Sequence, residues 1–333
     1  MKYITSILAT ILLPKITSAH VGYVVPEGTL EVTKGNDFGF LFSALHNPTN
    51  LLMMLITILV VLVLYFAAHK SYFVGQKIDE MKKRIHSYGE FIPWILRLSL
   101  GIALMGAGAK GALISPLASA GETIAVIELF VGFFLLAGFM LLPMTIVACA
   151  LFFSAIFQDF YIFGNIEFLA AAICLLILEN PRPGIDDIIG LRRLSFQHLK
   201  PYISFILRVG IGSALIYLAL FEKLLNPHFS ETVVNLYNLQ GVIDVSSAMW
   251  ILSVAVIELV VGLFLLIGFQ TRLTATIAFF VITTTFFYFK EDVYSHITLF
   301  GVLSVLFITG GGRYSVDRFL ERLRNPEIEE ISI

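Results

Sequence analysis

The sequence predicts an all-α polytopic membrane protein: two tandem four-helix transmembrane repeats, preceded by a signal peptide and one extra transmembrane helix. The first observation is composition, with 58% hydrophobic and 14% charged residues among 333 and a mean hydropathy of +0.88. The second is an internal repeat, because Ala125-Val-Ile-Glu-Leu-Phe-Val-Gly-Phe-Phe-Leu-Leu-Ala-Gly-Phe139 returns as Ala255-Val-Ile-Glu-Leu-Val-Val-Gly-Leu-Phe-Leu-Leu-Ile-Gly-Phe269. The third is that basic loops recur at a spacing that matches an even number of spans per repeat. The formal net charge of −2 gives no indication of nucleic acid as a partner.

The N-terminal region precedes the repeats. Residues 1–19 resemble a signal peptide, with Lys2, a short apolar stretch and the small-residue cleavage site Thr17-Ser18-Ala19. Residues 20–48 are expected to be an extracytoplasmic segment. Residues 49–92 are expected to hold the extra helix at 51–68, followed by a linker whose basic residues mark the cytoplasmic side: Lys70, Lys77, Lys82, Lys83 and Arg84.

The two repeats are predicted at 93–201 and 202–320, with a cytoplasmic tail at 321–333. The first has spans at about 93–114, 122–142, 144–158 and 164–180, and the second at about 203–224, 248–269, 271–289 and 294–310. Both repeats begin on the cytoplasmic side, so they are related by an axis along the membrane normal. The charge bias predicts a multi-pass protein of the plasma membrane, with residues 20–48 outside and the C-terminus cytoplasmic.

Each repeat carries one carboxylate inside its second span, Glu128 and Glu258. An ionised side chain at the centre of a bilayer costs about 2.5–3.5 kcal/mol on insertion scales, so each needs a proton, a partner or water. Lys110 and Lys223 are the expected partners. Two interpretations stay open: a structural ion pair between helices, or a catalytic carboxylate that handles protons beside a quinone or another substrate.

Other polar residues group at the two ends of the spans. Arg97 and Arg208 begin the first span of each repeat, where they are expected either to reach lipid headgroups or to pair with Asp186 and Asp317. The candidate substrate-binding residues are Lys110, Lys223, Tyr288 and His296, toward the outer ends of the spans near Glu128 and Glu258, together with Arg97 and Arg208 at the cytoplasmic ends.

Metal and haem chemistry find little support in the sequence. No two histidines face each other at mid-membrane depth, which argues against a bis-histidine haem, and the two cysteines form no disulfide framework or metal motif. If the signal peptide is cleaved after Ala19, the new N-terminal His20 and also His46 are candidate copper ligands.

The chain resembles the DoxX/DoxD-like family of four-helix membrane proteins, duplicated in one chain, and the second copy, from about Ile206 to Leu320, is the better match. The similarity rests on the opening Arg97-Leu-Ser-Leu-Gly101 with the small-residue stretch that ends in Lys110, on Ile-Glu-Leu with its following glycines, and on the closing Gly310-Gly-Gly-Arg-Tyr-Ser-Val-Asp317. The first repeat departs from the pattern at its close, where Glu179-Asn-Pro-Arg-Pro-Gly-Ile-Asp186 replaces the glycine-rich turn. The resemblance implies that Arg208, Lys223, Glu258 and the structural residues Arg313 and Asp317 are the family positions, with Arg97, Lys110 and Glu128 as their counterparts in the first copy.

The resemblance also implies a function. We expect an integral membrane subunit that supports quinone-linked oxidoreductase chemistry, such as the oxidation of sulfur compounds, with a redox partner subunit in the lipid bilayer. No cofactor motif for flavin, nicotinamide or metal is evident, so electrons would come from that partner. The alternatives are a non-enzymatic scaffold, receptor or small-molecule carrier, and extracytoplasmic copper handling through His20.

Overall fold

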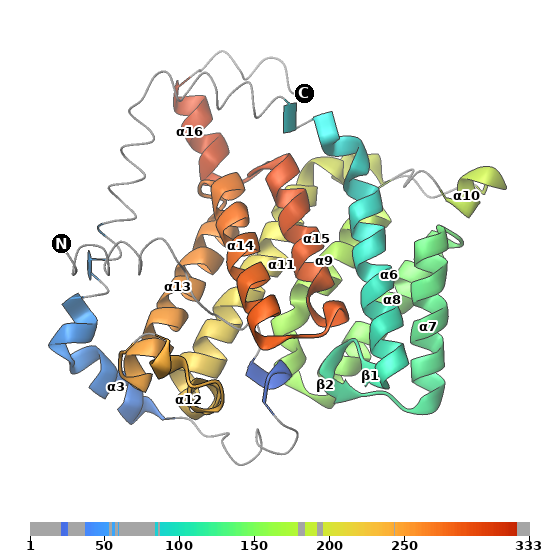
Figure 1. Cartoon of the computed structure of the whole chain (residues 1–333). Helices are drawn as coiled ribbons and strands as arrows, with labels where there is room; N and C mark the ends of the chain where they lie inside the picture. Colours follow the sequence, from blue (N-terminus) through green and yellow to red (C-terminus); the bar gives the residue numbers. More distant parts are fainter. Residues whose placement is uncertain are drawn as a thin grey trace. The chain divides into compact units, whose positions relative to one another are not determined.

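A computed structural model describes residues 21–25, 37–52, 55–56, 59, 84–85, 87–178, 184–191, 196–242 and 244–324 (Figure 1). The predicted signal peptide, His20, most of the predicted first span and most of the basic linker lie outside these residues and stay predictions. The chain forms two compact units. Unit 1 comprises Met1–Ser87, Leu218–Val260 and Val281–Phe289, and unit 2 comprises Tyr88–Tyr217, Val261–Phe280 and Lys290–Ile333.

The long helices confirm the predicted all-α polytopic membrane fold. The first repeat contains α6 (Ile92–Lys110), α7 (Glu122–Ala137), α8 (Leu141–Gln158) and α9 (Ile166–Ile177). The second contains α11 (Ile203–Leu218), α13 (Ser247–Ile267), α14 (Thr271–Phe289) and α15 (Val293–Thr309). Within the described residues, six helical segments are long and apolar enough to cross a membrane, and α15 is a shorter apolar helix.

Short elements connect the long helices. They are η1 (Val21–Tyr23), α3 (Phe38–His46), η2 (Ser87–Phe91), η3 (Phe160–Asn165), α10 (Ile185–Ile188), η4 (Gln197–Tyr202), the π-helix η5 (Ala219–Leu225), α12 (Pro227–Leu236), η6 (Leu239–Gly241) and α16 (Val316–Arg324). An antiparallel pair, β1 (Ala112–Leu113) and β2 (Ser115–Ser119), follows α6. The sequence placed residues 112–114 in the first span. The helix ends earlier because Gly111 takes a left-handed φ of 69° and caps it.

Glycines set the crossing of the first two helices in each repeat. In unit 2, a Cβ at Gly132 of α7 would lie 2.7 Å from the carbonyl oxygen of Gly101 in α6. The same relation recurs between Gly262 of α13 and Gly212 of α11, with a distance of 3.1 Å. Backbones that approach this closely gain van der Waals contact where no hydrophobic force acts between helices. The repeated sequence therefore produces a repeated helix crossing.

A second close approach joins the first and last long helices of unit 2. Helices α6 and α15 pack against each other, and a Cβ at Gly106 would overlap the side chain of Tyr294. On the outward faces of the helices, large apolar side chains such as Phe157, Phe280 and Phe287 are exposed. A bilayer covers such side chains in a membrane-spanning protein.

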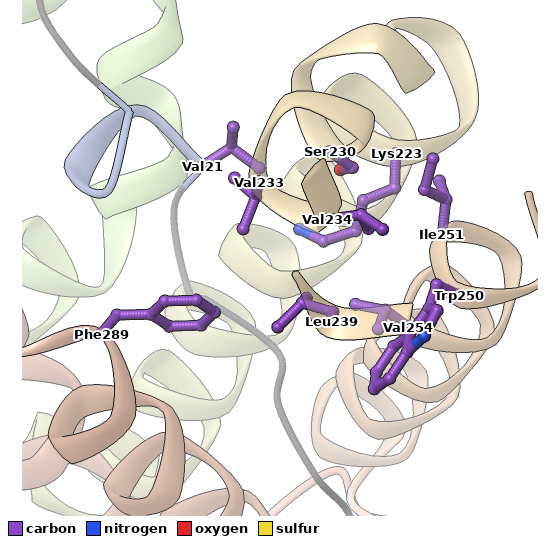
Figure 2. A pocket seen from close by; sticks show the side chains of 10 residues that line it. All are labelled: Val21, Lys223, Ser230, Val233, Val234, Leu239, Trp250, Ile251, Val254 and Phe289. Atoms are coloured by element: carbon purple, nitrogen blue, oxygen red, sulfur yellow. The ribbon is translucent and has the colours of Figure 1, made fainter. Parts of the chain in front are cut away.

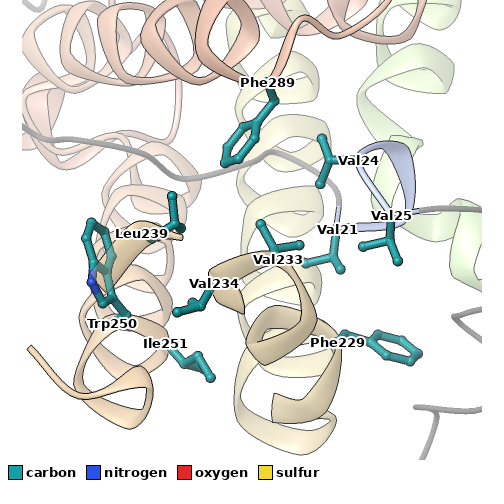
Figure 3. Packing of buried hydrophobic residues seen from close by; sticks show 10 residues of the cluster. All are labelled: Val21, Val24, Val25, Phe229, Val233, Val234, Leu239, Trp250, Ile251 and Phe289. Atoms are coloured by element: carbon teal, nitrogen blue, oxygen red, sulfur yellow. The ribbon is translucent and has the colours of Figure 1, made fainter. Parts of the chain in front are cut away.

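Unit 1 has its own apolar core, shown in Figure 3. The cluster draws residues from η1, α12, η6, α13 and α14: Val21, Val24, Val25, Phe229, Val233, Val234, Leu239, Trp250, Ile251 and Phe289. Its α12 face comes from the spacing of Phe229, Val233 and Val234, which places these side chains on one side of the helix. The segment that follows the predicted signal peptide is thus part of this core.

Candidate functional site

A π-helix brings two charged residues into the interior of unit 1. Helix α11 runs directly into η5, whose wider turns accommodate one more residue per turn than an α-helix. In η5 the side chain of Glu222 is fully buried and that of Lys223 is 1% exposed. Such π-turns are often found at functional sites.

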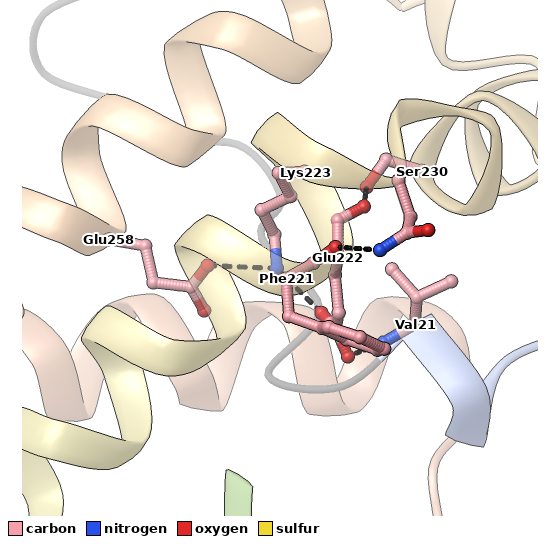
Figure 4. A network of polar contacts seen from close by, with 7 residues as sticks. Val21, Phe221, Glu222, Lys223, Ser230 and Glu258 are labelled. Atoms are coloured by element: carbon pink, nitrogen blue, oxygen red, sulfur yellow. Dashed lines mark hydrogen bonds and ion pairs between the residues drawn. The ribbon is translucent and has the colours of Figure 1, made fainter. Parts of the chain in front are cut away.

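Lys223 lies between two buried carboxylates (Figure 4). Its Nζ is 2.7 Å from Glu222 Oε2 and 2.8 Å from Glu258 Oε2, on helix α13. Glu258 is 6% exposed. Removing three charges from water is costly, and only the short distances and full pairing offset that cost. The structure therefore brings together two predicted site residues, Lys223 and Glu258, and adds Glu222.

Backbone contacts hold Glu222 in place. Its Oε1 accepts a hydrogen bond from the backbone N–H of Val21 at 3.0 Å, across 201 residues of sequence. Its own carbonyl oxygen accepts a bond from Ser230 Oγ at 3.2 Å, which ties η5 to α12. The carboxylate is consequently fixed by the N-terminal segment on one side and by Lys223 on the other.

A pocket opens beside this cluster (Figure 2). It has a volume of about 350 Å³, open mouth included, and Lys223 provides the charged group on its wall. Its other lining residues are Val21, Ser230, Val233, Val234, Leu239, Trp250, Ile251, Val254 and Phe289. A mostly apolar pocket with one or two fixed polar groups is the usual form of a small-molecule site.

The first repeat does not reproduce this arrangement. Glu128 is fully buried, but its Oε1 accepts a hydrogen bond from the backbone N–H of Ile114 at 2.8 Å. Lys110, the partner expected from the sequence, is exposed and lies 3.5 Å from Asp292 instead. The expected pairing of Lys110 with Glu128 is therefore wrong. In the first repeat, the hairpin that follows Gly111 provides a backbone N–H donor for Glu128 where a side-chain partner was expected.

Two further candidates lie apart from the pocket lining. His296 is fully buried in unit 2, where its Nε2 is 3.2 Å from Glu291 Oε2 and its Nδ1 is 2.9 Å from Ser295 Oγ. Tyr288 is half exposed at the end of α14 and stacks edge-on against Phe289, which does line the pocket. Tyr288 thus contacts a lining residue without lining the pocket itself.

The arginines that begin each repeat are buried, not extended to lipid headgroups. Arg97 is 3% exposed and Arg208 is fully buried, so the expectation that they reach the membrane surface is wrong. Arg208 donates to the carbonyl oxygens of Leu266 at 2.8 Å, Arg313 at 2.9 Å and Tyr314 at 3.1 Å. Its guanidinium thus binds one carbonyl near the end of α13 and two in the segment that precedes α16.

The aspartates predicted at the same ends cap helices. Asp317 accepts from the backbone N–H groups of Gln270 at 2.6 Å and Thr271 at 2.9 Å, at the start of α14. Asp186 does the same for Met140 at 2.7 Å and Leu141 at 3.1 Å, at the start of α8. Both repeats therefore have a buried arginine at their start and a capping aspartate at their end. Only the second repeat has the glycine-rich turn before that aspartate. Neither arginine is among the residues that line the pocket.

Metal-binding side chains do not gather in the part of the chain that the structure describes. No group of three histidine, cysteine, aspartate or glutamate residues there has the geometry to hold a metal ion. His46 is exposed at the end of α3, with Nδ1 2.8 Å from the carbonyl oxygen of Phe42. Cys149 and Cys174 are free thiols.

Sequence reasoning missed Glu222 and the N-terminal contact. A signal for Glu222 was present, because it is a second charged residue beside Lys223 in an otherwise apolar run. No sequence pattern marked the hydrogen bond of Val21, since its donor is a backbone group.

Comparison with known proteins finds one family. Residues 203–291 match the model of the DoxX family, from the start of α11 to the residue after Lys290. No curated protein and no solved structure gave a match. The match includes Arg208, Lys223 and Glu258 and leaves out the first repeat and α15. The part of the second repeat from residue 203 to residue 291 is accordingly similar to a DoxX domain, and the helices are those of a multi-pass membrane protein.

Proposed function

We propose that this protein is an integral membrane subunit that binds a quinone headgroup in the pocket of unit 1. The observation that carries the proposal is Lys223, a buried ammonium on the wall of an apolar pocket, held between Glu222 and Glu258. A quinone has the matching chemistry, because its ring is apolar and its two carbonyl oxygens accept hydrogen bonds.

The pocket supports this ligand class by its donor and its apolar lining. Its enclosed part is only about 30 Å³, so in this proposal the quinone ring occupies the open mouth. An ammonium has three N–H donors. One donates to Glu222 and the ammonium also forms an ion pair with Glu258, and in this proposal a further donor binds a ligand oxygen. Trp250 and Phe289 supply aromatic walls.

The carboxylates supply the proton chemistry. Reduction of a quinone to a quinol takes up two electrons and two protons, and the reverse reaction releases them. Glu258 and Glu222 share Lys223, so a proton that leaves or reaches one carboxylate changes how strongly the ammonium binds the other. The electrons come from a partner subunit in this proposal, which follows the family resemblance to subunits that oxidise sulfur compounds.

Tryptophan fluorescence tests the proposal directly. The chain has two tryptophans, Trp94 in α6 and Trp250 in the pocket, so Trp94→Phe leaves a single reporter at the site. Titration of this variant in detergent with a short-chain ubiquinone analogue is expected to quench Trp250 saturably. Adding Lys223→Met together with Glu258→Gln, which removes one charge of each sign, is expected to weaken binding at least tenfold. Lys110→Met is the matched control and should leave binding unchanged.

Two results would overturn the proposal. One is quenching that rises linearly with quinone and never saturates. The other is equal affinity in the folded double variant, which would leave the cluster with the structural role of joining η5 to α13.

A further inference from the structure

A carboxyl group that the proposed function does not use is buried between the two repeats, within unit 2. Glu167, in helix α9 of the first repeat, is fully buried, and its Oε1 is 3.0 Å from the hydroxyl oxygen of Thr298, in helix α15 of the second repeat. Thr298 is itself 3% exposed. The other carboxyl oxygen of Glu167, Oε2, is inaccessible to water and has no hydrogen-bond partner among the described residues. The contact between the repeats therefore contains a carboxyl oxygen that no described protein group binds.

Close helix packing around Glu167 keeps water and ions away from this oxygen. A Cβ at Gly210 of α11 would lie 2.4 Å from Ala170 Cβ and 3.3 Å from Glu167 Cα, so α11 reaches the backbone of α9. Helices α6, α8 and α15 also pack against α9. Because water does not reach Oε2, a water molecule or a metal cation could contact it only if these helices moved apart.

The cationic side chains on the elements around α9 are bound or exposed elsewhere, and the described residues offer Glu167 no ion pair. The bound ones are Lys110 with Asp292 at 3.5 Å, His296 with Glu291 at 3.2 Å, and Arg208 with three carbonyl oxygens. The guanidinium of Arg97 lies beside Gly138 at the end of α7, and His198 and Lys200 of η4 are exposed.

The start of α9 is not a free helix terminus that could offset a negative charge. Helix η3 leads directly into α9, and the N–H of Ile166 donates to the carbonyl oxygen of Phe163. The helical segment therefore begins at Phe160, seven residues before Glu167. The favourable effect of a helix dipole on an anion is confined to the first turn.

We propose that Glu167 is a proton-binding site: it is a neutral carboxylic acid, and the proton that it holds allows the two repeats to pack against each other at α9 and α15. A buried carboxylate without a cation is far less stable than the neutral acid. A proton also needs no cavity. A hydroxyl both donates and accepts, so Thr298 can accept the acidic hydrogen from Oε1. Oε2 is then an uncharged carbonyl oxygen, for which the lack of a partner costs less.

Infrared spectroscopy of the full-length protein in lipid detects this proton directly, because a carboxylic acid and a carboxylate absorb at different frequencies. At neutral pH, the difference spectrum between the parent and Glu167→Gln is expected to show the loss of one carboxylic acid band. Glu122→Gln replaces an exposed carboxylate of the same repeat and is the matched control, which should lose carboxylate bands instead. Loss of carboxylate bands in Glu167→Gln would overturn the proposal.

Thermal unfolding provides a second measurement. An amide resembles a neutral acid in shape and charge, so Glu167→Gln should change the melting temperature by less than about 2 °C. Thr298→Val should lower it equally in the parent and in the Glu167→Gln background, because each contains a hydrogen bond between neutral groups. A carboxylate would form a charge-assisted bond, roughly twice as strong, and Thr298→Val would then cost clearly more in the parent.

That unequal cost would overturn the proposal, and so would a Glu167→Gln variant that fails to fold. Neither measurement involves quinone. The proton site in unit 2 therefore fails or holds independently of the function proposed above for the pocket of unit 1.

Discussion

Lys223 and Glu258 form an ion pair of 2.8 Å between η5 and α13, with both side chains almost completely buried. The two residues are 35 positions apart in the sequence. Lys223 is the fifth of the seven residues of the π-helix η5. The ion pair thus has one partner on an irregular turn of the backbone.

Removing Lys223 alone should be strongly destabilising. Lys223→Met leaves two buried carboxylates without their shared ammonium, and loss of one partner of a buried pair typically costs about 3–5 kcal/mol. Thermal unfolding in detergent measures the loss. Lys223→Met combined with Glu258→Gln should recover part of it, and a combined loss that equals the sum of the single losses would show that the residues do not interact.

The two capping aspartates, Asp186 and Asp317, should contribute similar amounts to the stability of their repeats. Asp317→Ala removes the acceptor of the Gln270 and Thr271 N–H groups, and Asp186→Ala removes that of Met140 and Leu141. Each change is expected to cost about 1–2 kcal/mol, the range for a lost N-cap. Asp187→Ala is a neighbouring control for which little change is expected. A loss confined to the second repeat would contradict the equivalence of the two ends.

The two helix crossings that contain glycine should differ in how much stability they lose when a methyl group is added. A Cβ at Gly132 would lie 2.7 Å from the carbonyl oxygen of Gly101, whereas the nearest atom to one at Gly262 is 3.0 Å away. Gly132→Ala is therefore expected to destabilise by about 1–3 kcal/mol, the usual cost of overpacking, and Gly262→Ala by less. Gly89→Ala, where a Cβ would meet nothing within 4 Å, serves as the reference in the same melting assay.

Arg208 should not be replaceable by lysine. Its guanidinium reaches three carbonyl oxygens, on Leu266, Arg313 and Tyr314, and an ammonium on a flexible stem does not match that planar set of donors. Arg208→Lys is expected to lower the melting temperature by several degrees, since hydrogen bonds to charged groups contribute about 1.5–3 kcal/mol each. Arg322→Lys, on an exposed face of α16, should have no measurable effect, and equal stability of the two variants would be the contrary result.

Membrane orientation stays a prediction that labelling can test. Cysteines introduced at Lys200 and Arg322 should react with a membrane-impermeant thiol reagent from one side of the membrane, and one at Glu122 from the other side. Cys149 and Cys174 are replaced by serine and alanine first, so that native thiols do not contribute. Labelling of positions 200 and 322 from opposite sides would contradict the predicted topology.

The helices were predictable because apolar length is visible in the sequence. Each of the eight predicted repeat spans coincides with one long helix, and the predicted ends differ most where Gly111 ends α6, where α7 ends at Ala137 and where α11 passes into η5. The glycine itself was visible. What was not visible is that residues 112–119 form a hairpin, since they are as apolar as the helix before them.

The site was only partly predictable, because the sequence argument could consider only pairs of oppositely charged side chains. That reasoning led correctly to the contact of Lys223 with Glu258 and failed for Lys110, whose helix has no π-turn. It also missed every partner that is a backbone group. Arg208 binds carbonyls and Glu128 accepts from the N–H of Ile114, and neither backbone partner has a residue type that marks it.

The β1–β2 hairpin of the first repeat and helix α12 of the second repeat lie at corresponding points of the chain, between the first and second long helices. The repeat of four helices therefore accepts unrelated insertions at this connection, while the aspartate cap recurs in both copies. The two copies consequently differ in their polar contacts, a backbone donor for Glu128 and an ammonium for Glu258, without a change in the order of their helices.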